Sequence, residues 1–237
     1  DGNAADVSGN GNHGTVNGAT LGADRHGVAG KAYGFDGNDY IDAGNDASLD
    51  LSGTGFSWAA WAKHTFAPGS HAHANIIRKH HLNGHWLRFE PNSETINFHA
   101  YGITGVNGGI TLSPNSWFHV TGTYDGSSMS LFVNGVLDNA VSGSGNLSST
   151  LSDHLLIGKT SGGLSEFWNG SIDDVRIYDR ALSAAEVEQL YHLERPGSPL
   201  TDANFTTAIN LWFSDEANAT ATYGHISNWD VSAVTNM

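Results

Sequence analysis

Turn-forming dipeptides recur along most of this chain and divide it into short segments. Asn-Gly and Asp-Gly pairs favour the tight turns of β-hairpins, because Asn, Asp and Gly adopt positive φ at low cost. Examples lie at positions 17–18, 36–37, 83–84, 107–108, 125–126, 134–135 and 169–170. A chain interrupted this often cannot form long helices in these regions, and the spacing favours an antiparallel β-sandwich.

Short runs rich in β-branched and aromatic residues lie between the turns and predict strands. The run 129–138 predicts a hairpin with a type I′ turn at 134–135. In the run 56–63, Trp58 and Trp61 fall on opposite faces, so we expect a central strand covered on each side. The predicted strands span 40–43, 56–63, 76–79, 85–90, 96–101, 117–124, 129–133, 136–139 and 155–158.

The charge and cysteine content exclude several functions. The chain has 24 Asp and Glu against 10 Lys and Arg, a net charge of −14. Such a surface repels nucleic acid and anionic membranes. The absence of cysteine excludes disulfides and thiolate chemistry, and no apolar run approaches the length of a membrane span. We therefore expect no nucleic-acid partner and no membrane insertion.

The segment 167–183 carries two adjacent acids, Asp173 and Asp174, in a strand-like run after an expected turn at 169–170. Carboxylates inside a β run are costly unless they are paired. We expect Arg176, Arg180 or a calcium ion as the partner. Ser183 and Glu186 then form a capping-box pattern that predicts a helix over 184–193.

The end of the chain differs in pattern from the rest. Residues 195–199 (RPGSP) have the composition of a linker. Beyond them, Phe205, Ile209 and Trp212 stand at helical spacing. We therefore divide the chain into a sandwich domain at 1–194, a linker at 195–199 and a further segment at 200–237.

Six segments, in order, resemble the laminin-G-like jelly-roll domains of the concanavalin A-like lectin/glucanase superfamily. The resemblance covers 1–194 and implies an all-β fold, an antiparallel two-sheet jelly-roll sandwich with a groove on its concave face. A short C-terminal helix and a small helical or irregular tail are expected to follow. The segments are 6–14 (DVSGNGNHG), 32–41 (AYGFDGNDYI), 56–61 (FSWAAW), 117–126 (WFHVTGTYDG), 131–135 (LFVNG) and 167–183.

The last residues, 229–237 (WDVSAVTNM), are similar to the start of a BspA-like repeat of bacterial surface proteins. This second resemblance implies a larger multi-domain protein that is extracellular or at the cell surface. An isolated part of a repeat cannot bury its apolar face alone.

The jelly-roll resemblance also implies a structural calcium ion (Ca2+) that ties the N-terminal strand to the last strand. Calcium takes six to eight oxygen ligands, from carboxylates and from carbonyls of irregular turns. Alternatively, the aspartates form Asx turns and ion pairs with arginine. The matched positions are Asp6, Asp36, Asp39, Asp173 and Asp174.

Aromatic residues near turns are the candidates for ligand contact, because pyranose rings stack on aromatic faces. Trp86, Tyr101 and Trp168 have polar neighbours, and Arg88 supplies hydrogen bonds from the same region. The predicted ligand-binding set is Trp86, Arg88, His99, Tyr101 and Trp168. Thirteen histidines, among them His71, His80 and His81, include no helical i, i+4 pair, so solvated loop histidines are favoured over a transition-metal site.

Catalytic patterns are missing from the sequence. Retaining glycosidases need two carboxylates close together, and in this superfamily they stand as Glu-x-Asp-x-x-Glu, a spacing that does not occur here. We expect a non-catalytic, monomeric binding or adhesion module that recognises a polysaccharide, a glycoconjugate or a protein surface. The alternatives are a spacer or protein-adhesion domain without a glycan site, and a divergent polysaccharide hydrolase or lyase.

Overall fold

The computed structural model describes residues 2–235 except 52, 54, 68, 70–72, 80–83, 146, 148–152, 161–165, 198–199, 230 and 232. His71, His80 and His81 therefore lie outside the described residues. The chain divides into two compact units, Asp1–Ser183 and Ala184–Met237. The predicted domain boundary lies one helix later, at residue 194.

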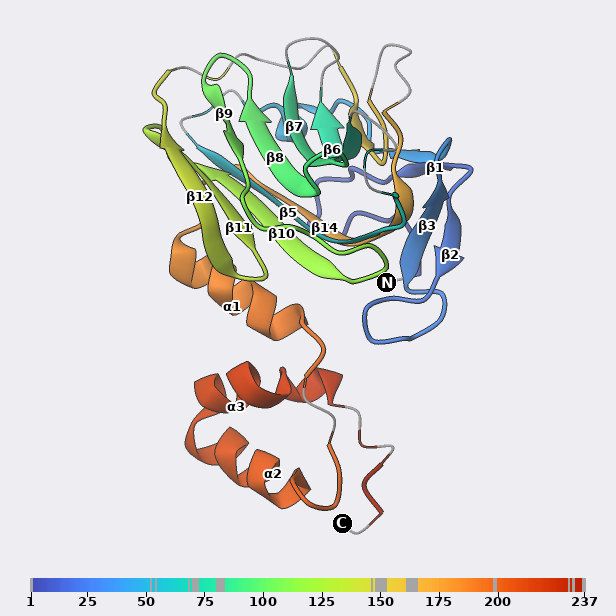
Figure 1. Cartoon of the computed structure of the whole chain (residues 1–237), viewed down its shortest axis with the longest axis vertical. Helices are drawn as coiled ribbons and strands as arrows, with labels where there is room; N and C mark the ends of the chain where they lie inside the picture. Colours follow the sequence, from blue (N-terminus) through green and yellow to red (C-terminus); the bar gives the residue numbers. More distant parts are fainter. Residues whose placement is uncertain are drawn as a thin grey trace. The chain divides into compact units, whose positions relative to one another are not determined.

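Two antiparallel sheets of seven strands form the first unit (Figure 1). The first sheet has the order β1-β4-β13-β6-β7-β8-β9. Its strands are β1 (Thr15–Asn17), β4 (Tyr40–Asp42), β13 (Leu155–Ile157), β6 (Ala74–Lys79), β7 (His85–Glu90), β8 (Thr95–Ala100) and β9 (Thr104–Asn107). A short 3-10 helix, Ala47–Leu49, follows β4.

The second sheet has the order β12-β11-β10-β5-β14-β3-β2, with β5 at its centre as predicted. Its strands are β12 (Val136–Ser142), β11 (Ser128–Val133), β10 (Phe118–Tyr124), β5 (Phe56–His64), β14 (Asn169–Tyr178), β3 (Ala32–Asp36) and β2 (Thr20–Gly22). The β11–β12 turn has positive φ at Asn134 (51°) and Gly135 (78°), as a type I′ turn requires. The expected two-sheet jelly-roll sandwich is confirmed.

Aromatic side chains from both sheets meet in the core. Phe56 and Trp58 of β5 are completely buried and make an edge contact, with ring centroids 5.7 Å apart. Phe98 of β8 lies 5.5 Å from Phe56 and so joins the first sheet to the second. Replacing a buried aromatic residue by alanine typically costs about 3–5 kcal/mol, so these contacts stabilise the sandwich strongly.

Gly122 of β10 faces the ring of Phe98 across the core. A Cβ atom at position 122 would overlap the ring of Phe98. The close approach of the two sheets at this point therefore requires glycine, although the backbone of Gly122 is ordinary strand.

Strand β14 is irregular where it carries the two adjacent acids. Its register with β5 shifts between Asp173 and Arg176, and Asp174 has a φ of 43° within this bulge. The turn predicted at 169–170 is wrong, because both residues belong to β14. Gly170 pairs with His64, and a Cβ there would collide with the carbonyl oxygen of Lys63.

Side chains of β12 close the sandwich along one edge. Asp138 accepts hydrogen bonds from the backbone of Gly109 (3.0 Å) and Ile110 (3.1 Å), which follow β9. Asn139 donates its side-chain amide to the carbonyl of Asn107 at 2.8 Å. The edge strand β9 of the first sheet is thus tied to the edge strand β12 of the second.

The second unit is helical, with α1 (Ala184–Glu194), α2 (Phe205–Ser214), α3 (Glu216–Tyr223) and a 3-10 helix, Ile226–Asn228. Helix α1 begins where the capping-box pattern predicts. Leu200, Ala208 and Val234 form a small core with Phe205, Tyr223 and Trp229 packed against it. Within the described part of the chain, no helix combines the length and apolar character that a membrane crossing demands.

Candidate functional site

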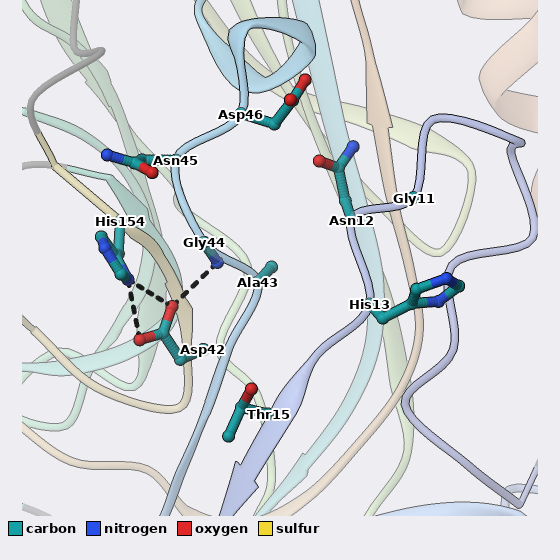
Figure 2. A pocket seen from close by; sticks show the side chains of 10 residues that line it. All are labelled: Gly11, Asn12, His13, Thr15, Asp42, Ala43, Gly44, Asn45, Asp46 and His154. Carbon is teal, nitrogen blue, oxygen red and sulfur yellow. Dashed lines mark hydrogen bonds and ion pairs between the residues drawn. The ribbon is translucent and has the colours of Figure 1, made fainter.

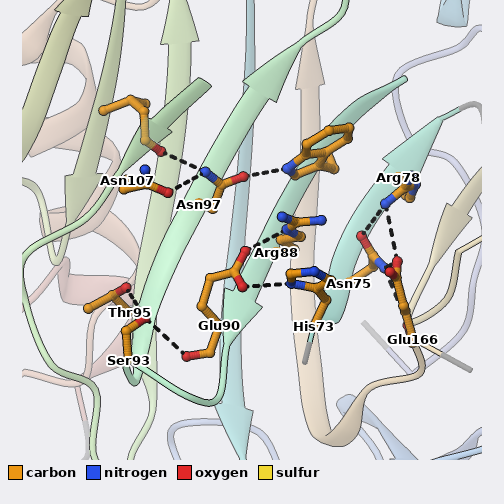
Figure 3. A network of polar contacts seen from close by, with 12 residues as sticks. His73, Asn75, Arg78, Arg88, Glu90, Ser93, Thr95, Asn97, Asn107 and Glu166 are labelled. Carbon is orange, nitrogen blue, oxygen red and sulfur yellow. Dashed lines mark hydrogen bonds and ion pairs between the residues drawn. The ribbon is translucent and has the colours of Figure 1, made fainter. Parts of the chain in front are cut away.

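Polar side chains gather on the outward side of the first sheet, and we call this set the polar face (Figure 3). Leu87, Phe89, Ile96 and Phe98 of β7 and β8 point into the core, so the residues between them point outward. The polar face is made of His73, Asn75, Arg78, Trp86, Arg88, Glu90, Asn97, His99, Asn107 and Glu166.

Trp86 stands at the centre of the polar face with neighbours on both sides. Strand β7 lies between β6 and β8, and Trp86 pairs with Arg78 on one side and His99 on the other. The His99 ring is stacked on the indole, with centroids 3.8 Å apart and planes 7° apart. The guanidinium of Arg78 lies 4.8 Å from the indole centroid. Because both ring faces are covered, a sugar ring cannot stack on Trp86 in this arrangement.

Further contacts of Trp86 fix its orientation. Its Nε1 donates a hydrogen bond to Oδ1 of Asn97, and Asn97 donates in turn to Oδ1 of Asn107 at 2.7 Å. The guanidinium of Arg88 lies 4.7 Å from the indole centroid. The indole is thus held in one position by its neighbours.

The Glu90 carboxylate joins the side chains of Arg88 and His73 (Figure 3). Glu90 Oε1 accepts a hydrogen bond from Arg88 Nε at 2.6 Å, and Glu90 Oε2 lies 2.6 Å from Nδ1 of His73. Both oxygens of Glu90 are therefore used, and Arg88 is oriented along the face.

Arg78 is held from the other side by Glu166, which lies close in space although far along the sequence. Arg78 Nη1 is 3.2 Å from Glu166 Oε2, and the amide of Asn75 donates to the same oxygen at 3.0 Å. The Arg78 side chain is only 5% exposed. Burial lowers the pKa of this guanidinium, and the Glu166 carboxylate opposes that shift.

His99 is neutral at physiological pH. Burial lowers its pKa below the usual range, and the charges of Arg88 and Arg78 act in the same direction. Its Nδ1 lies 3.0 Å from the carbonyl oxygen of Gly84 and must donate to it, since a carbonyl only accepts. The neutral ring suits its place near two arginines.

The predicted ligand-contact residues separate into two groups. Trp86, Arg88 and His99 lie together on the polar face, and Tyr101 lies in the turn that follows β8. Trp168 requires a correction, because it is completely buried and its ring packs edge-on against Phe66 at 5.8 Å. A ring without exposed surface cannot contact a ligand.

Sequence reasoning missed several residues of the polar face. Asn97 alternates with His99 along β8, so strand periodicity could have identified it. Asn75 lies three residues before Arg78 on β6 and shares its face only because the register with β7 shifts between Asn75 and Ile77, which alternation does not predict. His73 and Glu166 lie outside the strands, and no local pattern links Glu166 to Arg78, 88 positions away.

The predicted calcium ligands do not form one cluster. Asp6 accepts hydrogen bonds from the backbone of Ser8 and Asn12, which lower its pKa, and it therefore forms an Asx-type turn. Asp39 accepts from the backbone of Asp36 at 3.0 Å. Asp6, Asp173 and Asp174 line one cavity of about 670 Å³. Within the residues that the structure describes, no group of three or more His, Asp or Glu could hold a metal.

Arg25, which lies outside the expected set of Arg176, Arg180 and calcium, pairs with both acids in β14. Its guanidinium lies 3.0 Å from Asp173 and 2.8 Å from Asp174, and its side chain is 6% exposed. Burial and the neighbouring Asp174 raise the pKa of Asp173 to about 6, although Arg25 opposes the shift. A guanidinium thus joins the loop after β2 to β14, and the calcium site stays a prediction.

A small polar pocket of about 300 Å³ opens beside β1 and β4 (Figure 2). His154 faces Asp42 there, with Nδ1 2.8 Å from each carboxylate oxygen. Asn12 and Asp46 stand on the other wall, and Asp46 accepts from the backbone of Ser48. None of these residues is a predicted site residue, and the described residues that line the pocket include no Phe, Tyr or Trp.

Known structures share this architecture at low sequence identity. The binding domain of Paraclostridial Mosquitocidal Protein 1 is 18% identical with a TM-score of 0.64, covering 79% of this chain and 49% of that one. The botulinum neurotoxin serotype G binding domain is 17% identical (TM-score 0.60), covering 83% of this chain and 52% of that one. The chain thus spans about half the length of these toxin domains.

A third structure matches over nearly its whole length. Domain 4 of AbnA, a GH43 extracellular arabinanase from Geobacillus stearothermophilus, in complex with arabinotriose, is 21% identical with a TM-score of 0.58. The match covers 80% of this chain and 93% of that one. No curated protein matches the chain significantly in sequence. Residues 35–188, more than half of the chain, match the family model described as concanavalin A-like lectin/glucanases, and the chain therefore belongs to this superfamily.

Proposed function

We propose that the chain is a non-catalytic carbohydrate-binding module and that the polar face is its glycan site. The observation that carries this proposal is the fixed array of planar polar groups around Trp86. Arg88, Asn97 and Asn107 are oriented by their own hydrogen bonds before any ligand arrives. Preformed donors and acceptors in one layer suit recognition of sugar hydroxyl groups, because little conformational entropy is lost on binding.

The comparison with the arabinanase supports the same function. Domain 4 of that enzyme shares the fold and was solved with arabinotriose. The toxin structures are binding domains as well. The acids of the polar face favour binding over hydrolysis, since Glu90 and Glu166 are each paired with an arginine. We further propose an extracellular or cell-surface location and a monomeric module within a larger bacterial protein, with residues 200–237 beginning a BspA-like repeat.

A glycan array followed by calorimetry tests the proposal. The intact chain should bind at least one oligosaccharide, and Arg88→Ala should weaken that binding by about tenfold, the loss of one to two hydrogen bonds. Lys63→Ala is the matched control, because Lys63 lies on the second sheet over the ring of Trp117 at 5.1 Å. An array without hits would favour a spacer, and equal losses in both variants would refute the site.

A further inference from the structure

We infer that the polar face selects an uncharged glycan and discriminates against sugars that carry carboxylate or sulfate groups. This inference rests on the proposed function of the same site and names its ligand class. The basis is the charge balance of the polar face: each arginine on it is already compensated by a carboxylate of the chain itself.

All ten Lys and Arg residues of the chain lie within the part that the structure describes, so each of these side chains can be placed. Arg78 and Arg88 are the two that belong to the polar face. Arg78 pairs with Glu166 at 3.2 Å and Arg88 pairs with Glu90 at 2.6 Å. The side chain of Lys79 on the neighbouring strand is completely buried and donates to the carbonyl of Asp153 at 2.8 Å.

Two arginines and two glutamates leave the face without net charge. The chain as a whole carries −14, so its field repels an approaching anion. A carboxylate ligand that took a place beside Arg88 would stand next to the Glu90 carboxylate, 2.6 Å from the same guanidinium. Like charges at such short distance cost free energy, and this cost discriminates against acidic sugars.

Neutral hydroxyl groups face no such repulsion and still find partners. The Glu90 ion pair uses only Nε of Arg88, so among the contacts of the described residues the two Nη groups keep donors for a ligand. Asn107 is exposed, and its Oδ1 accepts from Asn97 while Nδ2 has no protein partner within the described chain. An exposed amide and a half-buried guanidinium in one layer match the oxygen atoms of adjacent hydroxyl groups.

The test compares neutral and acidic oligosaccharides on the intact chain by calorimetry. Arabino- and galacto-oligosaccharides represent the neutral class, and oligogalacturonides and sulfated galacto-oligosaccharides the acidic class. We expect a neutral ligand to bind at least about tenfold more tightly, with little change between about 50 and about 300 mM NaCl. Glu90→Gln should raise the affinity for oligogalacturonides by about fivefold or more and make it salt-dependent, since it leaves Arg88 uncompensated.

The outcomes separate the inference from the proposed function. If acidic sugars bind more tightly and Arg88→Ala abolishes that binding, the glycan site stands and its neutrality is refuted. The inference is also refuted if Glu90→Gln has a native circular dichroism spectrum but shows no higher affinity for acidic sugars. If no oligosaccharide binds, or if Arg88→Ala and Lys63→Ala bind as the unaltered chain does, the proposed function itself fails.

Discussion

The imidazole of His99 lies flat on the indole of Trp86, with ring centroids 3.8 Å apart and planes 7° apart. This stack and the guanidinium of Arg78 cover the two faces of the indole, so the tryptophan acts as a support for the surrounding polar groups. Its role differs from the sugar platform that the sequence suggests.

Removing the stack should therefore loosen the polar face. We expect His99→Ala to lower the free energy of unfolding by about 1–2 kcal/mol, since an aromatic pair and its buried area are lost. The fluorescence of Trp86 should shift. Glycan affinity should fall, because the indole that donates a hydrogen bond to Asn97 is no longer held in place. His99→Phe keeps a stacked ring and serves as the control. Equal affinities for His99→Ala and the unaltered chain would contradict the support role.

Arg25 should be among the most sensitive positions for stability. Arg25→Met leaves two acids of β14 without their cation, and breaking a buried pair typically costs about 3–5 kcal/mol. Urea unfolding at neutral pH measures the loss. Lys63→Met, which removes a charge held over Trp117, should cost less than about 1 kcal/mol. A small effect of Arg25→Met would show that solvent compensates Asp173 and Asp174.

A chelator distinguishes calcium from the Arg25 ion pairs. If the predicted calcium ion ties the N-terminal segment to β14, EDTA should lower the melting temperature by several degrees and added calcium should restore it. If Arg25 alone supplies the positive charge, the melting curve should not move. Repeating the scan with Arg25→Met shows whether a divalent cation takes over when the guanidinium is removed.

Gly122 tests how tightly the two sheets approach. Gly122→Ala places a methyl group where the Phe98 ring stands, and overpacking of this kind costs about 1–3 kcal/mol. Gly34→Ala in β3 is the matched control, because its Cβ would lie 3.6 Å from the carbonyl oxygen of Thr20, an ordinary contact. Thermal or urea unfolding compares the two variants. Equal stabilities would mean that Phe98 moves aside without cost.

The free energy of unfolding at acidic pH should depend on His119. Burial, aided by Arg25 and Arg176, lowers the pKa of His119 to about 3. The unfolded chain binds this proton first, near pH 6.5, so stability falls by up to about 1.4 kcal/mol per pH unit below that value. Asp173 acts oppositely: its pKa of about 6 exceeds the unfolded value of 3.8, so stability rises as pH falls through that window.

Two variants separate these opposing effects. His119→Gln should flatten the loss of stability between about pH 6.5 and about pH 4, and Asp173→Asn should steepen it. Urea unfolding at several pH values gives the slopes. Slopes identical to that of the unaltered chain in both variants would show that neither group titrates as its burial implies.

Sequence periodicity located most strands, including the three-residue strands β4 and β13, but not β1, β2, β3 and β9. The predicted strand 85–90 matches β7 residue for residue, because core and surface residues alternate along it. Strands β1, β2 and β9 have three or four residues each, nearly all of them at least partly exposed, so they carry no apolar pattern to recognise. Asn169-Gly170 was mistaken for a turn, since the need for glycine there comes from the nearby carbonyl of Lys63.

The site could be predicted only in part, for a related reason. Trp86, Arg88 and His99 share a face through local alternation and strand pairing. Glu166 and Arg25, in contrast, meet partners 88 and 148 positions away, Arg78 and Asp173. Such pairs depend on how the strands are ordered in the two sheets, which a single sequence does not reveal.

The edge closure at Asp138 has a consequence for how these molecules behave together. Exposed edge strands can pair with the same strand of another molecule and begin aggregation. Asp138 and Asn139 direct their hydrogen bonds to the backbone beyond β9, which places one edge of each sheet against the other. Copies displayed densely on a surface, or concentrated by a polymeric glycan, can therefore stay separate folded molecules along this edge.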